Sequence, residues 1–194
     1  MSHQVNIIRR FTEIEAIASI ESVLMDIRNG KYAEAIKKVR EAHKLSGKAE
    51  ADKVKKALLY GITLSGTFAG VRQRKNLMTY NGHLAVDFDS VPQDILLSLK
   101  ATACQAKYSR AVFISPSGNG LKILVETNST PENHDMVYRE VLSYYEALLG
   151  IEADYGGGYG LERICYFSCD PNLFYNPAST IYQSTFQILN NVQL

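Results

Sequence analysis

The stretch HLAVDFD, residues 83–89, predicts a β-strand that ends in two carboxylates. Side chains of a strand alternate between the two faces of a sheet, so Asp87 and Asp89 share one face and the apolar residues share the other. Two neighbouring carboxylates repel each other, but they suit a site where a divalent cation lies between them and a phosphate. Aspartates also end strands in ordinary turns, so the pair by itself leaves both interpretations open.

The residues after this strand predict an alternation of helices and strands. Apolar residues at helical spacing indicate two helices, and short apolar runs between turn residues indicate three more strands. The helices are expected at 91–107 and 131–150, and the strands at 110–115, 121–127 and 162–170. This β-α-β-β-α-β order predicts an α+β, ferredoxin-like (RRM-like) core with an antiparallel sheet, both helices on one face and the carboxylates on the other.

The first third of the chain is expected to be mainly helical. Apolar residues at helical spacing predict helices at 11–28, 31–44 and 51–60, with a loop at 45–50. Glycine, serine and threonine are frequent in residues 62–82, which favours extended segments and turns.

The predicted elements divide the chain into three parts. We expect a helical N-terminal extension, residues 1–76, packed on an α+β core, residues 77–185, and a tail, residues 186–194. No run of about 18 apolar residues is present, which predicts a protein that does not span a membrane. The N-terminus lacks a signal-peptide pattern, which favours a cytoplasmic location.

Charge is distributed unevenly along the chain. Residues 1–80 contain 15 Lys and Arg against 8 Asp and Glu, whereas residues 81–194 contain 6 against 12. A basic part joined to an acidic part fits a metal site beside a polyanion-binding surface, although solvated helix faces produce the same pattern. The cluster of Arg72, Arg74 and Lys75 is a candidate for contacts with nucleic acid.

The connection SPSGNG, residues 115–120, joins two of the predicted strands and is followed by Lys122. Small residues and glycines let backbone N–H groups approach an anion, and hydroxyls and a lysine can add to such a site. A tight hairpin turn also requires glycine, so Gly118 and Gly120 are equally consistent with a turn that binds nothing.

Two charged residues precede or begin the last predicted strand. Asp154 offers a third carboxylate, but it is also an ordinary residue for a loop. Arg163 has the forked geometry that binds phosphates, and it could instead pair with Glu162 or Glu126.

Taken in order, these motifs resemble the archaeo-eukaryotic primase superfamily, and within it the VirE N-terminal-like domain. The resemblance rests on DFD at 87–89, S-x-SGxG at 115–120, and an acid followed by R-x-C-x-x-S-x-DP at 163–171. The runs LSGTFAGxR at 64–72 and DPNLFYN at 170–176 are also similar to that family.

The resemblance implies roles for individual residues. Asp87, Asp89 and Asp154 match the catalytic acids that bind Mg²⁺ or Mn²⁺. The nucleotide- and phosphate-binding residues would be Ser115, Ser117, Gly118, Gly120, Lys122, Arg163 and Ser168. Active members of the superfamily usually have a histidine where this chain has Lys122, and a lysine meets a phosphate as a point charge with different geometry.

Two functions remain open from the sequence. The first is a primase-polymerase-like nucleotidyltransferase that makes primers on a single-stranded DNA template from NTPs or dNTPs, in a replication protein of a mobile element. The second is a catalytically inactive module of the same fold that binds nucleic acid or docks a helicase domain or partner. The acid pair favours the first, because carboxylates without a metal ion repel phosphates.

Overall fold

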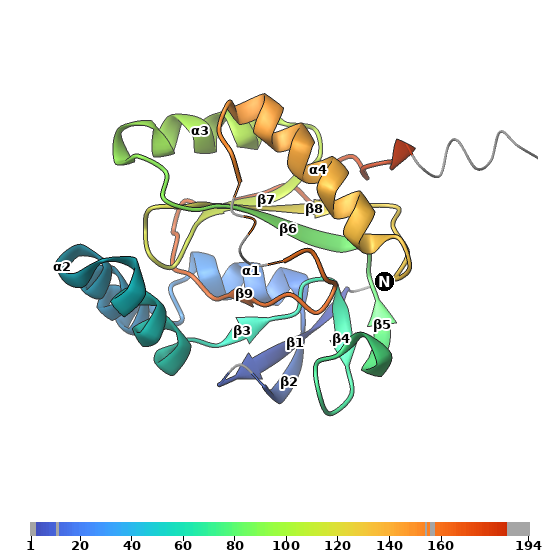
Figure 1. Cartoon of the computed structure of the whole chain (residues 1–194), viewed down its shortest axis with the longest axis horizontal. Coiled ribbons are helices and arrows are strands. Elements are labelled where there is room, and N and C mark those ends of the chain that lie inside the picture. Colours follow the sequence, from blue (N-terminus) through green and yellow to red (C-terminus); the bar gives the residue numbers. More distant parts are fainter. Residues whose placement is uncertain (1–2, 11, 154, 156–157, 186–194) are drawn as a thin grey trace, which may run out of the picture.

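The computed structural model of the protein describes residues 3–10, 12–153, 155 and 158–185. It is an α+β fold in which two antiparallel four-stranded sheets lie on one another, with a two-stranded ribbon at one side (Figure 1). The expected tail, residues 186–194, lies outside the described part of the chain. Within that part, no helix has both the length and the apolar character needed to cross a membrane.

The first sheet contains most of the core that the sequence predicted. Its strand order is β10-β7-β8-β6, and the helices α3 and α4 cover one of its faces (Figure 1). The bounds are β6 (His83–Phe88), α3 (Gln93–Gln105), β7 (Ser109–Ile114), β8 (Leu121–Glu126), α4 (His134–Leu149) and β10 (Phe174–Tyr175). The predicted order of strands and helices is therefore confirmed from β6 to α4.

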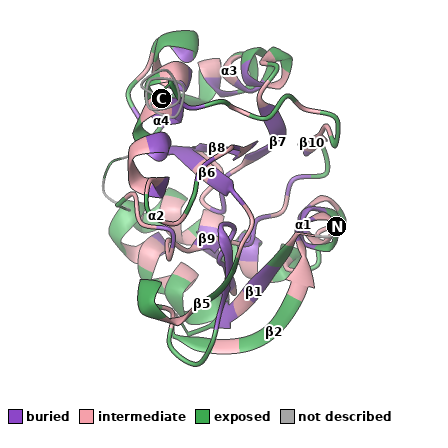
Figure 2. Ribbon diagram, turned by 90° about the vertical axis from the view of Figure 1, so that its right-hand side faces the viewer, coloured by how far each residue is buried: buried purple, intermediate pink, exposed green. Residues whose placement is uncertain are grey.

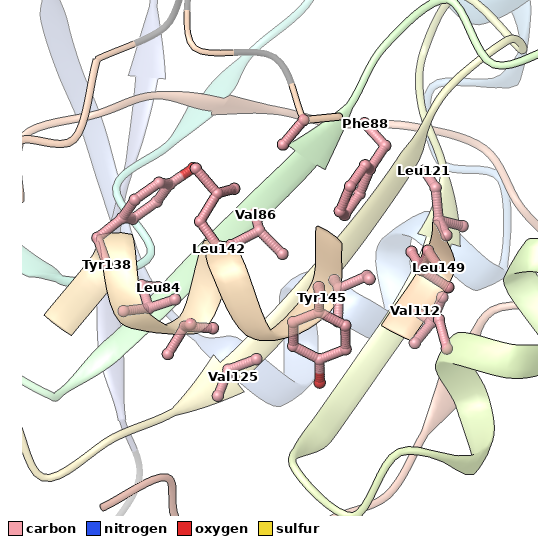
Figure 3. Close-up of a cluster of buried hydrophobic side chains, with 14 of the residues drawn as sticks. Leu84, Val86, Phe88, Val112, Leu121, Val125, Tyr138, Leu142, Tyr145 and Leu149 are labelled. Atoms are coloured by element: carbon pink, nitrogen blue, oxygen red, sulfur yellow. The ribbon is translucent and has the colours of Figure 1, made fainter. Parts of the chain in front are cut away.

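The apolar face of β6 packs under the two helices. Leu84, Val86 and Phe88 are almost completely buried in one cluster with Leu142 and Tyr145 of α4 (Figure 3). Because side chains alternate along a strand, this packing directs Asp87 to the opposite face of the sheet. The predicted orientation of the acidic residue is confirmed.

The second sheet covers the other face of the first sheet, opposite the helices α3 and α4. Its order is β2-β1-β3-β9, and α1 lies between it and the first sheet (Figures 1 and 2). The bounds are β1 (Gln4–Arg9), β2 (Glu13–Ser19), α1 (Ile20–Arg28), β3 (Gly61–Ile62) and β9 (Cys165–Tyr166). Ile20 and Ile27 of α1 are buried together with Phe113 and Leu124 of the first sheet, so a second apolar core joins the two layers.

The helix expected at 11–28 is wrong in its first half. Residues 13–19 instead pair with β1 as a hairpin, which gives the buried side chains of β1 a partner strand. Ser19 then caps α1, because its hydroxyl accepts a hydrogen bond from the Ser22 amide at 3.1 Å.

The last predicted strand also differs from expectation. Only Cys165–Tyr166 is a strand, and it pairs with β3 rather than with the first sheet. A side chain at Gly61 would collide with Ile164, so this pairing depends on glycine. The first sheet keeps the β7-β8-β6 order of a ferredoxin-like core, but β10 replaces the expected fourth strand and lies beside β7.

A long helix, α2 (Ala33–Leu58), lies beside the two sheets (Figure 1). The loop expected at 45–50 is confirmed in part, because the backbone of Gly47 is non-helical (φ 79°, ψ −172°) and divides α2 into two helical segments that meet at a kink. The extended segments expected at 62–82 are confirmed as the ribbon of β4 (Gly66–Phe68) and β5 (Leu77–Tyr80), with the short 3-10 helix η1 (Arg74–Asn76) between them.

Candidate functional site

A cavity of about 460 Å³ opens at the end of β6, between the β7–β8 hairpin, α2 and β9. Six basic and three acidic side chains line it, so basic groups are in excess. The charged lining residues are Lys48, Asp52, Lys55, Lys56, Arg72, Asp87, Asp89, Lys122 and Arg163. Such an excess of positive charge attracts a polyanion.

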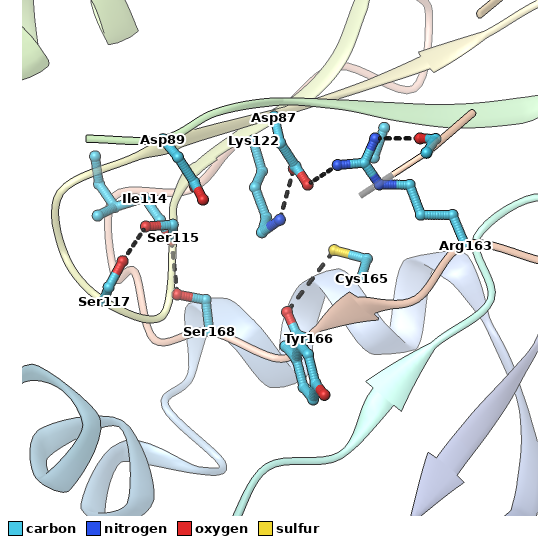
Figure 4. Close-up of polar contacts among 12 residues, drawn as sticks. Asp87, Asp89, Ile114, Ser115, Ser117, Lys122, Arg163, Cys165, Tyr166 and Ser168 are labelled. Atoms are coloured by element: carbon cyan, nitrogen blue, oxygen red, sulfur yellow. Dashed lines mark hydrogen bonds and ion pairs between the residues drawn. The ribbon is translucent and has the colours of Figure 1, made fainter. Parts of the chain in front are cut away.

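Asp87 lies at the centre of this charged group. It is opposite Lys122 in the β6–β8 register, and the Lys122 ammonium lies 2.5 Å from its Oδ1. The Arg163 guanidinium donates to its Oδ2 at 2.8 Å (Figure 4). Burial by itself would raise the pKa of Asp87, but the charges of Lys122 and Arg163 outweigh burial and hold this pKa below its ordinary value. Asp87 is therefore ionised, and both of its oxygens are paired with cations.

Arg163 lies in the segment before β9, and several contacts hold its side chain in place. Besides Asp87, its guanidinium donates to the Tyr138 hydroxyl and to the Gly158 carbonyl, the latter at 2.9 Å. The sequence left Glu162 and Glu126 open as partners, and the structure instead pairs Arg163 with Asp87. These contacts fix the guanidinium beside the cavity that it lines.

Asp89 follows β6 and is less buried than Asp87. Its Oδ2 lies 3.4 Å from the Lys48 ammonium of α2, at the surface. A Cβ at Gly120 would lie 3.1 Å from Asp89 Oδ1 and 2.7 Å from the Phe88 carbonyl oxygen. Glycine is thus needed at position 120 for the hairpin to approach the end of β6 this closely.

The β7–β8 hairpin is closed by hydrogen bonds within itself. The Ser115 amide donates to the Gly120 carbonyl at 2.8 Å, and Gly118 has a positive φ of 83°. The hydroxyls of Ser115 and Ser117 lie 3.0 Å apart, and the Ser117 hydroxyl also donates to Asn119 Oδ1 at 2.6 Å. Ser115 and Ser117 both line the cavity, so their hydroxyls lie near any ligand there.

The other predicted site residues lie in different places. Ser168 is buried and donates to the Ile114 carbonyl at 2.6 Å, so its hydroxyl fixes the end of β7 (Figure 4). Arg72 lines the cavity, whereas Arg74 pairs with Asp135 of α4 at 2.5 Å and Lys75 is an exposed residue of η1. The expected basic cluster is therefore divided between two surfaces. Asp154 lies outside the described residues.

The contribution of α2 to the cavity was not predicted from the sequence. Lys48, Asp52, Lys55 and Lys56 all line the cavity, and Lys55 pairs with Asp52 at 2.6 Å. The density of lysines between positions 48 and 56 is the signal in the sequence, but it is equally typical of a solvated helix face. Only the placement of α2 beside the hairpin gives these lysines a common ligand-binding surface.

The carboxylates offer the oxygen ligands that Mg²⁺ and Mn²⁺ prefer. Asp89 is the more accessible of the two, and its carboxylate pairs with the Lys48 ammonium at the surface. The two oxygens of Asp87 are already hydrogen-bonded, but a carboxylate has about four lone-pair positions, so it can still contribute. The described residues therefore fit a divalent ion held mainly by Asp89 and completed by the outer side of Asp87.

The fold and the site define an α+β domain with a basic cavity around a pair of carboxylates. The chain belongs to the BT4734-like, N-terminal domain family, whose model matches residues 53–175. The finer VirE N-terminal-like assignment that the motifs suggested is not tested by this match and stays a prediction. No curated protein matches the chain.

Among solved structures, the chain is similar to the AEP domain (PP-N190) of the primase-polymerase of cyanophage S-2L. The sequence identity is 15% and the TM-score is 0.42, and the match covers 75% of this chain and 76% of the phage domain. A likeness of this extent assigns no activity to the present protein.

Proposed function

We propose that this domain is a metal-dependent nucleotidyltransferase of the primase-polymerase type, acting on a single-stranded DNA template with NTPs or dNTPs. One observation carries the proposal. The carboxylates of Asp87 and Asp89 line the same cavity as the serines of the hairpin and six basic side chains. An acidic pair within a basic cavity suits a reaction that brings together a divalent cation and several phosphates.

Asp89 and the outer side of Asp87, with Asp154 as the third acid implied by the resemblance, would hold Mg²⁺ or Mn²⁺. When bound, such an ion lowers the pKa of an attacking hydroxyl and binds phosphate oxygens. By the same resemblance, the domain would serve a replication protein of a mobile element, together with a helicase domain or partner.

The basic residues divide into two groups by their partners. Lys122 and Arg163 pair with Asp87, so they keep its carboxylate ionised and fix its position. Lys55, Lys56 and Arg72 line the same cavity, and no ion pair with Asp87 is found for them among the described residues. In this position they would attract the triphosphate of a nucleotide and stabilise the charge that develops on the leaving pyrophosphate.

The test is primer synthesis and primer extension on single-stranded DNA with Mg²⁺ or Mn²⁺, supplied with all NTPs or all dNTPs. Asp89→Asn is the decisive variant, since Asp89 is partly exposed and its replacement leaves the buried ion pairs of Asp87 intact. Asp94→Asn is the matched control, because Asp94 is an exposed acid in the first turn of α3. We expect synthesis by the wild type and by Asp94→Asn, and a loss of at least about 100-fold in Asp89→Asn. Equal synthesis by all three proteins would refute the proposal.

A second function is favoured by one specific observation. Both oxygens of Asp87 are paired with Lys122 and Arg163, so the centre of the cavity is neutralised without any metal ion. A binding module that holds nucleic-acid phosphates but transfers nothing would use the same cavity. Wild-type protein that binds nucleotides or single-stranded DNA without added metal, and incorporates nothing with it, would support this second function.

A further inference from the structure

A second group of ligand-type side chains lies at the other end of β6. His3, His83 and Glu126 each offer one ligand atom, and these atoms all lie within 4.8 Å of one another. His83 is the first residue of β6 and Glu126 faces it across the β6–β8 ladder. His3 immediately precedes β1, so the group joins the two sheets.

The proton positions on His83 follow from its partners. Its Nδ1 lies 3.0 Å from the carbonyl oxygen of Asn81, and because a carbonyl only accepts, Nδ1 must carry a proton. In a neutral ring Nε2 is then a bare lone pair. This Nε2 is buried, has no hydrogen-bond partner within the described part of the chain, and lies 3.7 Å from Glu126 Oε2.

His83 Nε2 and Glu126 Oε2 therefore face each other as two acceptors; Oε2 also accepts from Arg110 at 2.6 Å, whereas Nε2 has no partner among the described residues. A buried ring nitrogen that is left without a partner costs free energy. A metal ion satisfies it, since neutral imidazole and carboxylate are ligands that zinc accepts.

We propose that His3, His83 and Glu126 bind a zinc-type transition-metal ion that ties the start of β1 to the β6–β8 ladder. The site is separate from the basic cavity, which lies at the far end of β6.

The geometry needs only a small adjustment. Ligand atoms about 2.1 Å from a zinc ion lie about 3.4 Å apart in a tetrahedral site. His83 and Glu126 are already at 3.7 Å, and His3 is partly exposed at the end of a strand, where its side chain can move. A cavity of about 490 Å³ borders His3, which leaves room for water as the fourth ligand.

Neighbouring groups fix the proposed ligands. The Asn81 carbonyl orients the His83 ring, and Arg110 donates to Glu126 Oε2 at 2.6 Å. Ligand histidines and carboxylates are commonly held by such outer hydrogen bonds. The His3 carbonyl is itself fixed, because it accepts from the Ile20 amide at 2.9 Å.

The experiment uses tag-free protein of the full sequence, titrated with Zn²⁺ by calorimetry and with Co²⁺ by its visible absorption. We expect one equivalent to bind the wild type, and His3→Ala to bind at least about 100-fold more weakly. His3 is the residue of choice because it is partly exposed, whereas His83 is fully buried and its replacement could unfold the chain. His43→Ala, at a partly exposed histidine of α2, is the matched control and should bind as the wild type does.

Thermal unfolding gives a second readout. With free Zn²⁺ at about 100 times its dissociation constant, the midpoint should rise by roughly 5–10 °C in the wild type and not in His3→Ala. Equal Zn²⁺ affinity of the wild type and His3→Ala would overturn the proposal. A loss of binding in Asp89→Asn would also overturn it, because the ion would then belong to the carboxylate pair in the basic cavity.

Discussion

The two ends of the β6–β8 ladder differ in how an acidic side chain is paired with the residue opposite it. At one end Asp87 faces Lys122, and at the other His83 faces Glu126, in the same register. Positions 83 and 87 are four residues apart, so both pairs lie on the same face of the sheet. Both oxygens of Asp87 are paired with cations, whereas the ring nitrogen Nε2 of His83 has no hydrogen-bond partner among the described residues. The acid at each end is thus paired with a cation, Glu126 with Arg110, but the His83 end keeps one buried acceptor without a partner among the described residues.

This difference indicates a structural role for the paired Asp87 and a ligand-binding role for the His83–Glu126 pair. The two positions are about 13 Å apart along the strand, so each pair has its own electrostatic surroundings. At the Asp87 end, the central groups are already paired with one another. A ligand there would contact the less buried Asp89 and the lysines of α2. At the His83 end, a cation would satisfy the site itself.

The largest expected effect comes from removing the Asp87 charge. Asp87→Asn leaves the buried cations of Lys122 and Arg163 without their counter-ion, which typically costs about 3–5 kcal/mol. Asp89→Asn removes only a surface pair with Lys48 and should cost less than about 1 kcal/mol. Urea unfolding of the two variants measures both values.

Equal destabilisation by the two aspartate variants would show that Asp87 is not the structural centre of this end. The expected difference also decides which variant can test catalysis. A loss of activity in Asp87→Asn would not distinguish unfolding of the domain from loss of a catalytic group. Asp89→Asn is free of this ambiguity, which is why it is the test of catalysis.

The next largest effect is the pH dependence of stability at the histidine end. Burial lowers the pKa of His83 to about 3 and that of His134 to about 4, whereas both are near 6.5 in the unfolded chain. The unfolded state therefore binds protons first, and stability falls as the pH drops from about 6.5 towards 3. Each histidine should contribute a loss of about 2 kcal/mol between pH 7 and pH 5.

Urea unfolding at pH 7 and pH 5 checks this expectation in metal-free buffer. His83→Gln should be less stable at pH 7 but should lose about half as much stability on going to pH 5. The Asp87 end contributes in another window: its pKa is lowered in the fold, so its contribution is lost only below about pH 4. An unchanged pH dependence in His83→Gln would contradict the assignment of a buried neutral ring.

The sequence predicted the Asp87 end better than the His83 end for a physical reason. Alternation along HLAVDFD was enough to place Asp87 opposite the apolar core, and this holds for any sheet that the strand joins. The partners of Asp87 depend on register, which pairs it with Lys122, and on the path of the chain before β9, which brings in Arg163. Register and chain path follow from tertiary packing, so local patterns do not contain them.

The second sheet shows the same limit. The stretch at 13–19 has apolar residues that suit either a helix or a strand, and pairing with β1 decides for the strand. Likewise, Cys165 and Phe167 are buried in the core between the two sheets, which draws β9 to β3 and away from the expected position. His3 and His83 are 80 positions apart, and only the stacking of the two sheets makes them neighbours.

The smallest expected effect is a change in the affinity of the basic cavity for single-stranded DNA. Lys56→Ala removes one positive charge from the cavity, so binding of single-stranded DNA should weaken a few-fold and its salt slope should fall by about 0.7. Lys37→Ala removes the same charge from an exposed position of α2, and among the described residues Lys37 lies outside the cavity lining. It should leave the salt slope unchanged, as measured by fluorescence anisotropy at several salt concentrations.

Saturating DNA should not alter Zn²⁺ affinity, because the two ends of the ladder are expected to bind their ligands independently. A shift of the Zn²⁺ affinity in either direction would show that the two ends are coupled.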